Sequence, residues 1–164
     1  MLQKIISGGQ TGADQAALDF AIARGIPHGG WCPRGRLAED GHIPLCYQLS
    51  ETPSPDYAQR TESNVRDSGG TVIFSIAASL TGGSAWTVEL AGRYHKPCLH
   101  LSRERDGEAA AGKLLDFLRV NKIEVLNVAG PRHSQEPEVA QFVQEVLERS
   151  LQPGEPQEPE EATD

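Results

Sequence analysis

The sequence lacks the cysteine patterns that mark disulfide-rich and metal-binding proteins. Its 3 cysteines are an odd number, are irregularly spaced and include no C-x-x-C pair. The 5 histidines show no metal-ligand spacing. We therefore expect no disulfide framework and no metal ligands. The lack of disulfides favours the reducing cytoplasm as the location of the protein.

Long apolar runs and an excess of positive charge are also missing. No run approaches the roughly 20 residues needed to cross a bilayer, and no secretory segment is evident at the N-terminus. With 15 Lys and Arg against 23 Asp and Glu, the net charge is -8. These absences argue against a membrane partner and against nucleic acid as a partner.

Much of the acidity is confined to the C-terminus. Residues 152–164 contain five acidic residues and no Lys or Arg, and they are rich in Pro and almost without apolar side chains. Such a composition predicts a disordered tail. We expect residues 1–151 to form a single domain.

Familiar nucleotide and catalytic motifs are absent as well. The sequence has no Walker A loop and no G-x-G-x-x-G fingerprint. It also has no nucleophile elbow, no Cys–His signature and no obvious pair of carboxylates. Nothing in the residues themselves demands catalysis.

What the sequence does contain is a glycine turn between a strand and a helix near its start. Residues 4–14 read Lys-Ile-Ile-Ser-Gly-Gly-Gln-Thr-Gly-Ala-Asp, and strong helix formers fill residues 13–24. The unpaired N–H groups and the dipole of such a helix predict an oxyanion site at Gly8–Gly12. Alternatively, Thr11 and Asp14 form a capping box and serve only the helix.

A second glycine turn of the same kind follows the clearest buried strand, residues 71–76. Thr81-Gly82-Gly83-Ser84 then opens the next helix. In open α/β sheets, ligands bind at the carboxyl ends of the strands, where two such turns can face one crevice. The turn predicts a second oxyanion site, with simple helix capping as the alternative. Glu89, one turn inside the helix, is either an acid/base candidate or an ordinary helix residue.

The remaining pattern alternates strands and helices. Strands are expected at residues 96–101 and 123–128, and helices at residues 107–120 and 138–151. Together with the two strands above and a brief one after residue 25, this predicts an α/β fold with about five strands.

Two arginines and a tryptophan follow that brief strand. Arg34 and Arg36 could donate to an anionic ligand, with Trp31 as a stacking face. The alternative is that these arginines pair with Glu39 and Asp40 while Trp31 fills a gap in the core.

The helix expected from Pro55 to about Asp67, with Ser54 as its cap, has a thin apolar stripe. Its polar face therefore binds a partner, such as a ligand or a second subunit, or it is an ordinary solvent-exposed surface. Its polar and aromatic face consists of Tyr57, Arg60, Thr61 and Asn64. Arg132, after the last strand, could reach the same crevice.

Four of these segments resemble the proposed molybdenum (cofactor) carrier family. They are residues 7–14, residues 29–36 with Glu39-Asp40-Gly41, residues 57–67, and residues 127–132. The resemblance covers roughly residues 3–147, and its first two motifs are quite specific.

The resemblance implies a Rossmann-like, doubly wound and mainly parallel sheet with helices on both faces. It also implies a relation to the LOG and lysine-decarboxylase-like group, whose members bind nucleotides and include phosphoribohydrolases. The family's proposed role is to bind, store and hand on molybdenum cofactor, a pterin with a phosphate and a dithiolene-held molybdenum. The implied partners are a small anionic ligand, a molybdoenzyme acceptor, and further copies in a cytosolic homodimer or homotetramer.

The residues and the resemblance together give the expected binding set. Its members are Ser7, Gly8, Gly9, Gln10, Thr11, Gly12, Asp14, Trp31, Arg34, Arg36, Tyr57, Arg60, Thr61, Asn64, Thr81, Gly82, Gly83, Ser84 and Arg132. Their ligand would be molybdenum cofactor (molybdopterin), or molybdate or another oxyanion.

One departure bears on catalysis. The enzymatic relatives carry Pro-Gly-Gly-x-Gly-Thr-x-x-Glu, whereas this chain has Thr81 in place of the Pro and Trp86 in place of the Gly before the Thr. A bulky Trp86 would obstruct a nucleoside monophosphate held as in those enzymes. The alternative functions are a LOG-like enzyme that cleaves an N-glycosidic bond, with Glu89 and Arg34 as catalytic candidates, or a sensor of a nucleotide-derived signal.

Overall fold

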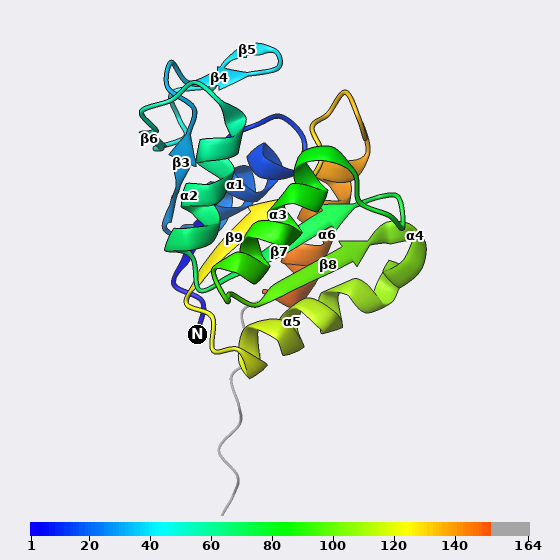
Figure 1. Cartoon of the computed structure of the whole chain (residues 1–164). Coiled ribbons are helices and arrows are strands. Elements are labelled where there is room, and N and C mark those ends of the chain that lie inside the picture. The colour runs from blue at the N-terminus through cyan, green and yellow to red at the C-terminus, as the bar shows by residue number, and fades with distance from the viewer. Residues whose placement is uncertain (152–164) are drawn as a thin grey trace, which may run out of the picture.

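The computed structural model describes residues 1–151, and a five-stranded parallel sheet lies at its centre (Figure 1). The strands are β1 (Lys4–Ile6), β2 (His28–Gly29), β7 (Gly70–Ser75), β8 (Cys98–Ser102) and β9 (Val125–Ala129). Their order across the sheet is β2-β1-β9-β7-β8, and every neighbouring pair is parallel. The predicted tail, residues 152–164, lies outside the described residues.

The strand order is that of a doubly wound sheet whose first strand has moved to the end of the chain. If β9 is counted first, the order becomes 3-2-1-4-5, the arrangement of dinucleotide-binding domains. In register, Ile5 lies beside Leu126 of β9, and Val72 lies beside Val128 of β9. The predicted Rossmann-like, mainly parallel sheet is therefore confirmed.

Helices cover both faces of the sheet. On one face α6 (Val139–Ser150) packs between α1 (Ala13–Arg24) and α5 (Ala110–Val120). The other face carries α2 (Tyr57–Asp67) and α3 (Gly82–Arg93), which pack against each other in front of the sheet in Figure 1. The short helix α4 (Arg103–Asp106) and the 3₁₀ turn η1 (Gly107–Ala109) lead from β8 into α5. No helix among residues 1–151 has the length and apolar character of a membrane span.

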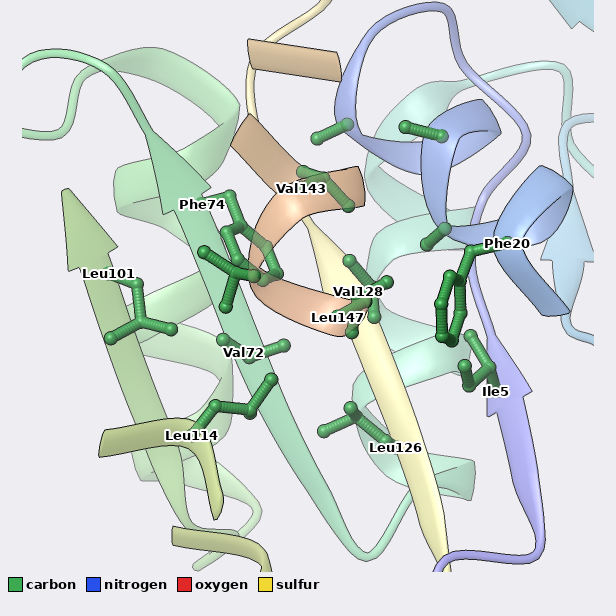
Figure 2. Close-up of a cluster of buried hydrophobic side chains, with 14 of the residues drawn as sticks. Ile5, Phe20, Val72, Phe74, Leu101, Leu114, Leu126, Val128, Val143 and Leu147 are labelled. Atoms are coloured by element: carbon green, nitrogen blue, oxygen red, sulfur yellow. The ribbon is translucent and has the colours of Figure 1, made fainter. Parts of the chain in front are cut away.

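The main core lies between the sheet and the helices α1, α5 and α6 (Figure 2). Phe74 of β7 and Phe142 of α6 meet edge to face, with ring centroids 5.7 Å apart. Val143 and Leu147 are fully buried against the same strands. The apolar residues of α6 recur at helical spacing, so this face could be predicted from the sequence.

Residues 31–51 form a separate layer beside the main sheet. They contain the parallel pair β3 (Trp31–Cys32) and β6 (Ser50–Glu51) and the hairpin of β4 (Leu37–Ala38) and β5 (Gly41–His42), which lies at the tip of this layer in Figure 1. The layer has its own apolar cluster, which includes Ile43 and Tyr47.

One predicted boundary needs correction. Helix α2 begins at Tyr57 with Asp56 as its N-cap, and not at Pro55 with Ser54 as the cap. The Ser54 hydroxyl instead accepts a hydrogen bond from the N–H of Asp56 within the loop.

The topology opens a crevice at the carboxyl ends of β9 and β7. The chain leaves β9 toward α6 on one face of the sheet and leaves β7 toward α3 on the other. Such a switch point is where ligands of open α/β sheets bind.

Candidate functional site

A cavity of about 390 Å³ occupies the switch point. Its walls come from the loop after β1, from α2, from the first turns of α3, and from residues 127–135 at the end of β9. This volume lies within the usual range of small-molecule sites. The two glycine turns and the polar face of α2 thus meet in one place, as expected.

The cavity divides the expected binding residues into two groups. Those that line it are Gly8, Gln10, Asp14, Tyr57, Arg60, Thr61, Asn64, Gly82, Gly83, Ser84 and Arg132. Those that lie outside its lining are Ser7, Gly9, Thr11, Gly12, Trp31, Arg34, Arg36 and Thr81.

Two N–H groups of the first glycine turn, and that of the residue that follows it, have acceptors within the protein. The N–H of Gln10 donates to the Asp14 carboxylate over 3.2 Å, and that of Thr11 donates to Oε1 of Gln10 over 3.1 Å. The N–H of Ala13 donates to the carbonyl of Pro131. The Asp14 carboxylate therefore takes one of the N–H groups that the predicted oxyanion site at Gly8–Gly12 would offer to a ligand.

The capping-box alternative is not formed. Helix α1 has Gly12 as its N-cap and no side-chain cap. The Thr11 hydroxyl instead donates to the Glu39 carboxylate and accepts from the N–H of His133. The Ser7 hydroxyl donates to the carbonyl of Val128 and ties β1 to β9.

Two glycines of this turn serve close packing. Gly9 and Gly12 have φ angles of 79° and 81°. A Cβ at Gly9 would lie 2.7 Å from Cδ1 of Leu49, and a Cβ at Gly12 would lie 2.5 Å from the carbonyl oxygen of Pro131. Glycine is required here because neighbouring protein segments approach the backbone.

The second glycine turn leaves three successive N–H donors without an acceptor in the described chain. Thr81 is the N-cap of α3, and its side chain makes no cap bond. The first helix-closing bond runs from the N–H of Ala85 to the carbonyl of Thr81. Within the described chain, the N–H groups of Gly82, Gly83 and Ser84 have no acceptor. They lie at the positive end of the helix dipole, in the wall of the cavity.

Two arginines bring positive charge to the cavity. Arg60 donates to the carbonyl of Gly8 over 3.2 Å, and its guanidinium lies 3.8 Å from the Asp14 carboxylate. Arg132 has no carboxylate partner among residues 1–151. The two guanidinium carbons lie 5.0 and 5.4 Å from the centroid of the Tyr57 ring.

The single acid in the lining does not cancel this charge. Burial raises the pKa of Asp14, and the neighbouring Arg60 opposes that rise. Asp14 is the only acidic residue in the cavity wall, against Arg60 and Arg132. The site is therefore suited to an anionic ligand.

Two further donors have no partner. The Nε2 atom of Gln10 and the Nε1 atom of Trp86 are buried, and neither has an acceptor within the described chain. Both residues line the cavity. Buried polar groups in folded proteins are normally paired, so these atoms point to a ligand that supplies acceptors.

Three residues expected to bind or react have other positions. Arg36 donates to the carbonyls of Pro44 and Tyr47, each over 2.8 Å, and so braces the 31–51 layer. Arg34 is exposed and lies outside the cavity lining. Glu89 lies on the exposed face of α3.

Glu89 pairs with Arg93 across one helical turn, over 2.9 Å. Neither catalytic candidate of the enzyme reading, Glu89 or Arg34, lines the cavity.

Trp31 also lies outside the cavity lining. The side chain of Asn64 bonds to both the N–H and the carbonyl of Trp31, over 2.8 and 3.0 Å, and the indole N–H donates to Asp67. The aromatic residues that line the cavity are Tyr57 and Trp86.

Several lining residues are not among the expected binding residues. Among them are Trp86, Thr87, Asn127 and Gln135. The signal for Trp86 and Thr87 was their place one turn into α3, directly after the glycine turn. Asn127 is a buried polar residue within an apolar strand, which is itself a sign of a site.

Comparison with known proteins gives two matches. Residues 5–151 match the model of the circularly permutated YpsA SLOG family. The crystal structure of a protein named "Putative molybdenum carrier protein", from Syntrophus aciditrophicus SB, matches with a TM-score of 0.90 and 53% sequence identity. The match covers 92% of this chain and 95% of that one. No curated protein matches the chain significantly.

Proposed function

The chain belongs to the circularly permutated YpsA SLOG family, and on that basis we propose that its cavity binds and carries molybdenum cofactor. The name of the Syntrophus relative supports a molybdenum cargo, and the permuted strand order agrees with the family's description. The cargo in this proposal is a pterin with a phosphate group and a dithiolene that holds molybdenum.

One observation carries the proposal. The free N–H groups of Gly82, Gly83 and Ser84 share a cavity with Arg132, which has no carboxylate partner in residues 1–151. A helix N-terminus that shares a cavity with an unpaired guanidinium is a strong binding arrangement for a phosphate or an oxo-anion. The phosphate of the cofactor would bind at this end of the cavity.

The rest of the cavity fits the pterin. Tyr57 and Trp86 offer aromatic surface for a flat ring system, and the unpaired donors of Gln10 and Trp86 offer hydrogen bonds to its polar edge. None of the three cysteines lines the cavity. Molybdenum would therefore keep its dithiolene ligands while the protein holds the organic part.

The geometry favours carrying over cleavage. Glu89 and Arg34 both lie outside the lining, and Asp14 is the one acid within it. The two catalytic candidates of the N-glycosidic cleavage reading are thus both absent from the cavity wall. The proposal extends to a cytoplasmic homodimer or homotetramer that delivers its cargo to a molybdoenzyme, an extension that rests on the family resemblance.

The test is to identify what the protein retains. The chain is purified from a cofactor-producing host, and the released material is examined by mass spectrometry and metal analysis. Gly83→Asp places a carboxylate among the free N–H groups of α3, where a Cβ has nothing within 4 Å. An acidic residue in the first turn favours a helix, so this variant keeps the fold.

A matched control is available in the same chain. Gly112 also lies in the first turn of a helix, α5, with nothing within 4 Å of a Cβ, but outside the cavity. We expect a pterin with stoichiometric molybdenum from the wild type and from Gly112→Asp, and a severalfold lower content from Gly83→Asp. A nucleotide in place of the pterin would overturn the proposal in favour of a LOG-like enzyme or a nucleotide sensor.

A further inference from the structure

The side-chain amide of Gln10 is hydrogen-bonded at its oxygen and unpaired at its nitrogen. Its Oε1 accepts hydrogen bonds from the N–H of Thr11 over 3.1 Å and from the N–H of Glu39 over 2.9 Å. Its Nε2 has no partner, and the residue is 4% exposed in the wall of the cavity. Turning the amide around would break both bonds to Oε1, so the end left for a ligand is a donor.

Glu39 keeps this orientation in place from outside the cavity. Its carboxylate accepts hydrogen bonds from the hydroxyls of Thr11 and Ser134. Three segments, the loop after β1, the β4–β5 turn and the loop after β9, are thereby joined around Gln10. The unpaired amide is thus part of a fixed network.

Other neutral polar side chains of the cavity have partners within the protein. The hydroxyls of Thr61 and Thr87 donate to backbone carbonyls one turn earlier, over 3.0 and 2.8 Å. The amide of Asn64 donates one hydrogen bond to the carbonyl of Trp31, and that of Asn127 donates one to Oγ1 of Thr71 over 3.2 Å. Gln10 is therefore the buried amide in this wall whose nitrogen has no partner within the described chain.

We propose that Gln10 selects the heterocycle of the cargo by donating from Nε2 to a ring oxo group. The inference rests on the proposed function and adds a specificity to it. The cavity would prefer a phosphorylated 4-oxo pterin to the corresponding 4-amino compound. An amino group at position 4 is a hydrogen-bond donor, and it cannot accept from the N–H donor of Gln10. Sites built to pair one hydrogen-bonding group discriminate strongly against its replacement.

The decisive variant is Gln10→Glu. A carboxylate keeps an oxygen for the N–H groups of Thr11 and Glu39 and replaces the Nε2 donor with an acceptor of nearly the same shape. The probes are 6-hydroxymethylpterin monophosphate and its 2,4-diamino analogue, which differ in the group at position 4 and in the N3 hydrogen that accompanies the oxo group. Equilibrium dissociation constants are measured for both compounds.

Gln135→Glu is the control for the added negative charge. Gln135 lines the same cavity, but its side chain is exposed. We expect this variant to weaken binding of both compounds without altering their ratio. The wild type is expected to bind the 4-oxo compound at least about tenfold more tightly than the 4-amino compound. Gln10→Glu is expected to reverse that order.

The outcomes separate this inference from the function on which it rests. Equal affinity of the wild type for the two compounds would overturn the role of Gln10, and so would an unchanged ratio in Gln10→Glu. Either result would leave the pterin carrier standing. Failure of the wild type to bind either compound would overturn the carrier proposal, and the specificity of Gln10 with it.

Discussion

The guanidinium of Arg60 lies 3.8 Å from the carboxylate of Asp14, and both groups bond to the glycine turn that the sequence presents as a phosphate loop. Both side chains are largely buried. A Cβ at Gly8 would lie 2.4 Å from Cδ of Arg60, so glycine at this position makes room for the arginine. The pair joins α2 to the first turn of α1, and the turn before α3 keeps its free N–H groups.

Removal of Arg60 should destabilise the protein, because Asp14 would then be a buried carboxylate without a cationic partner. We expect Arg60→Ala to lower the free energy of unfolding by about 3–5 kcal/mol at pH 7, because a buried carboxylate loses its partner. Burial already raises the pKa of Asp14 above its unfolded value, and the loss of Arg60 raises it further. A carboxyl group whose pKa is higher in the folded state than in the unfolded state destabilises the protein at pH values above the folded pKa. The difference in the free energy of unfolding between the wild type and Arg60→Ala should therefore shrink as the pH falls through that pKa.

Urea unfolding at pH 7 and at pH 5 checks this prediction. Arg93→Ala is the control, because Arg93 forms an exposed ion pair with Glu89. Its removal should change stability by no more than about 1 kcal/mol. A loss in Arg60→Ala as small as that of the control, with no dependence on pH, would show that the Arg60–Asp14 pair is unimportant.

Gly12 should tolerate no side chain. Its φ of 81° is unfavourable for other residues, and a Cβ would lie 2.5 Å from the backbone oxygen of Pro131. We expect Gly12→Ala to destabilise the protein by roughly 1–3 kcal/mol from backbone strain, with the contact adding to it. Gly112→Ala, in the open first turn of α5, should instead be neutral or stabilising by about 1 kcal/mol. Thermal unfolding of the two variants compares them directly, and equal melting temperatures would refute the packing role of Gly12.

Glu39 should stabilise the fold in a way that depends on pH. Hydrogen bonds from the hydroxyls of Ser134 and Thr11 hold the pKa of Glu39 below its ordinary value. The resulting stability is present above the unfolded pKa, near 4.3, and is lost as the pH falls through the lowered folded pKa. Glu39→Gln should therefore be less stable than the wild type at pH 7, and the difference should narrow between pH 5 and pH 3. A difference that stays constant over this range would contradict the prediction.

The fold could be predicted from the sequence because its signals are local. The β-branched runs of β1 and β7 and the helical spacing of Phe142, Val143 and Leu147 each fit a single kind of element. The switch-point crevice follows from the alternation of these elements. The start of α2 could not be predicted in the same way. Ser54 has the side chain of an N-cap, but its hydroxyl accepts from the N–H of Asp56 within the loop.

The site could be predicted only in part because its deciding contacts are distant in sequence. Both glycine turns have the same local pattern. They differ because Asp14 and the carbonyl of Pro131 accept from the N–H groups of Gln10 and Ala13 at the first turn. Arg36 looked like a ligand donor because its acceptors, the carbonyls of Pro44 and Tyr47, depend on how a long loop folds.

The central claim is that the anion binds at the start of α3, and amide chemical shifts test it most directly. The ¹H–¹⁵N spectrum of the isotope-labelled chain is recorded while 6-hydroxymethylpterin monophosphate is added. We predict that the largest shifts occur at the amides of Gly82, Gly83 and Ser84, with small shifts at Gly9 and Gly12. Shifts concentrated at Gly8–Gly12, with the α3 amides unmoved, would contradict the account and return the anion site to the first glycine turn.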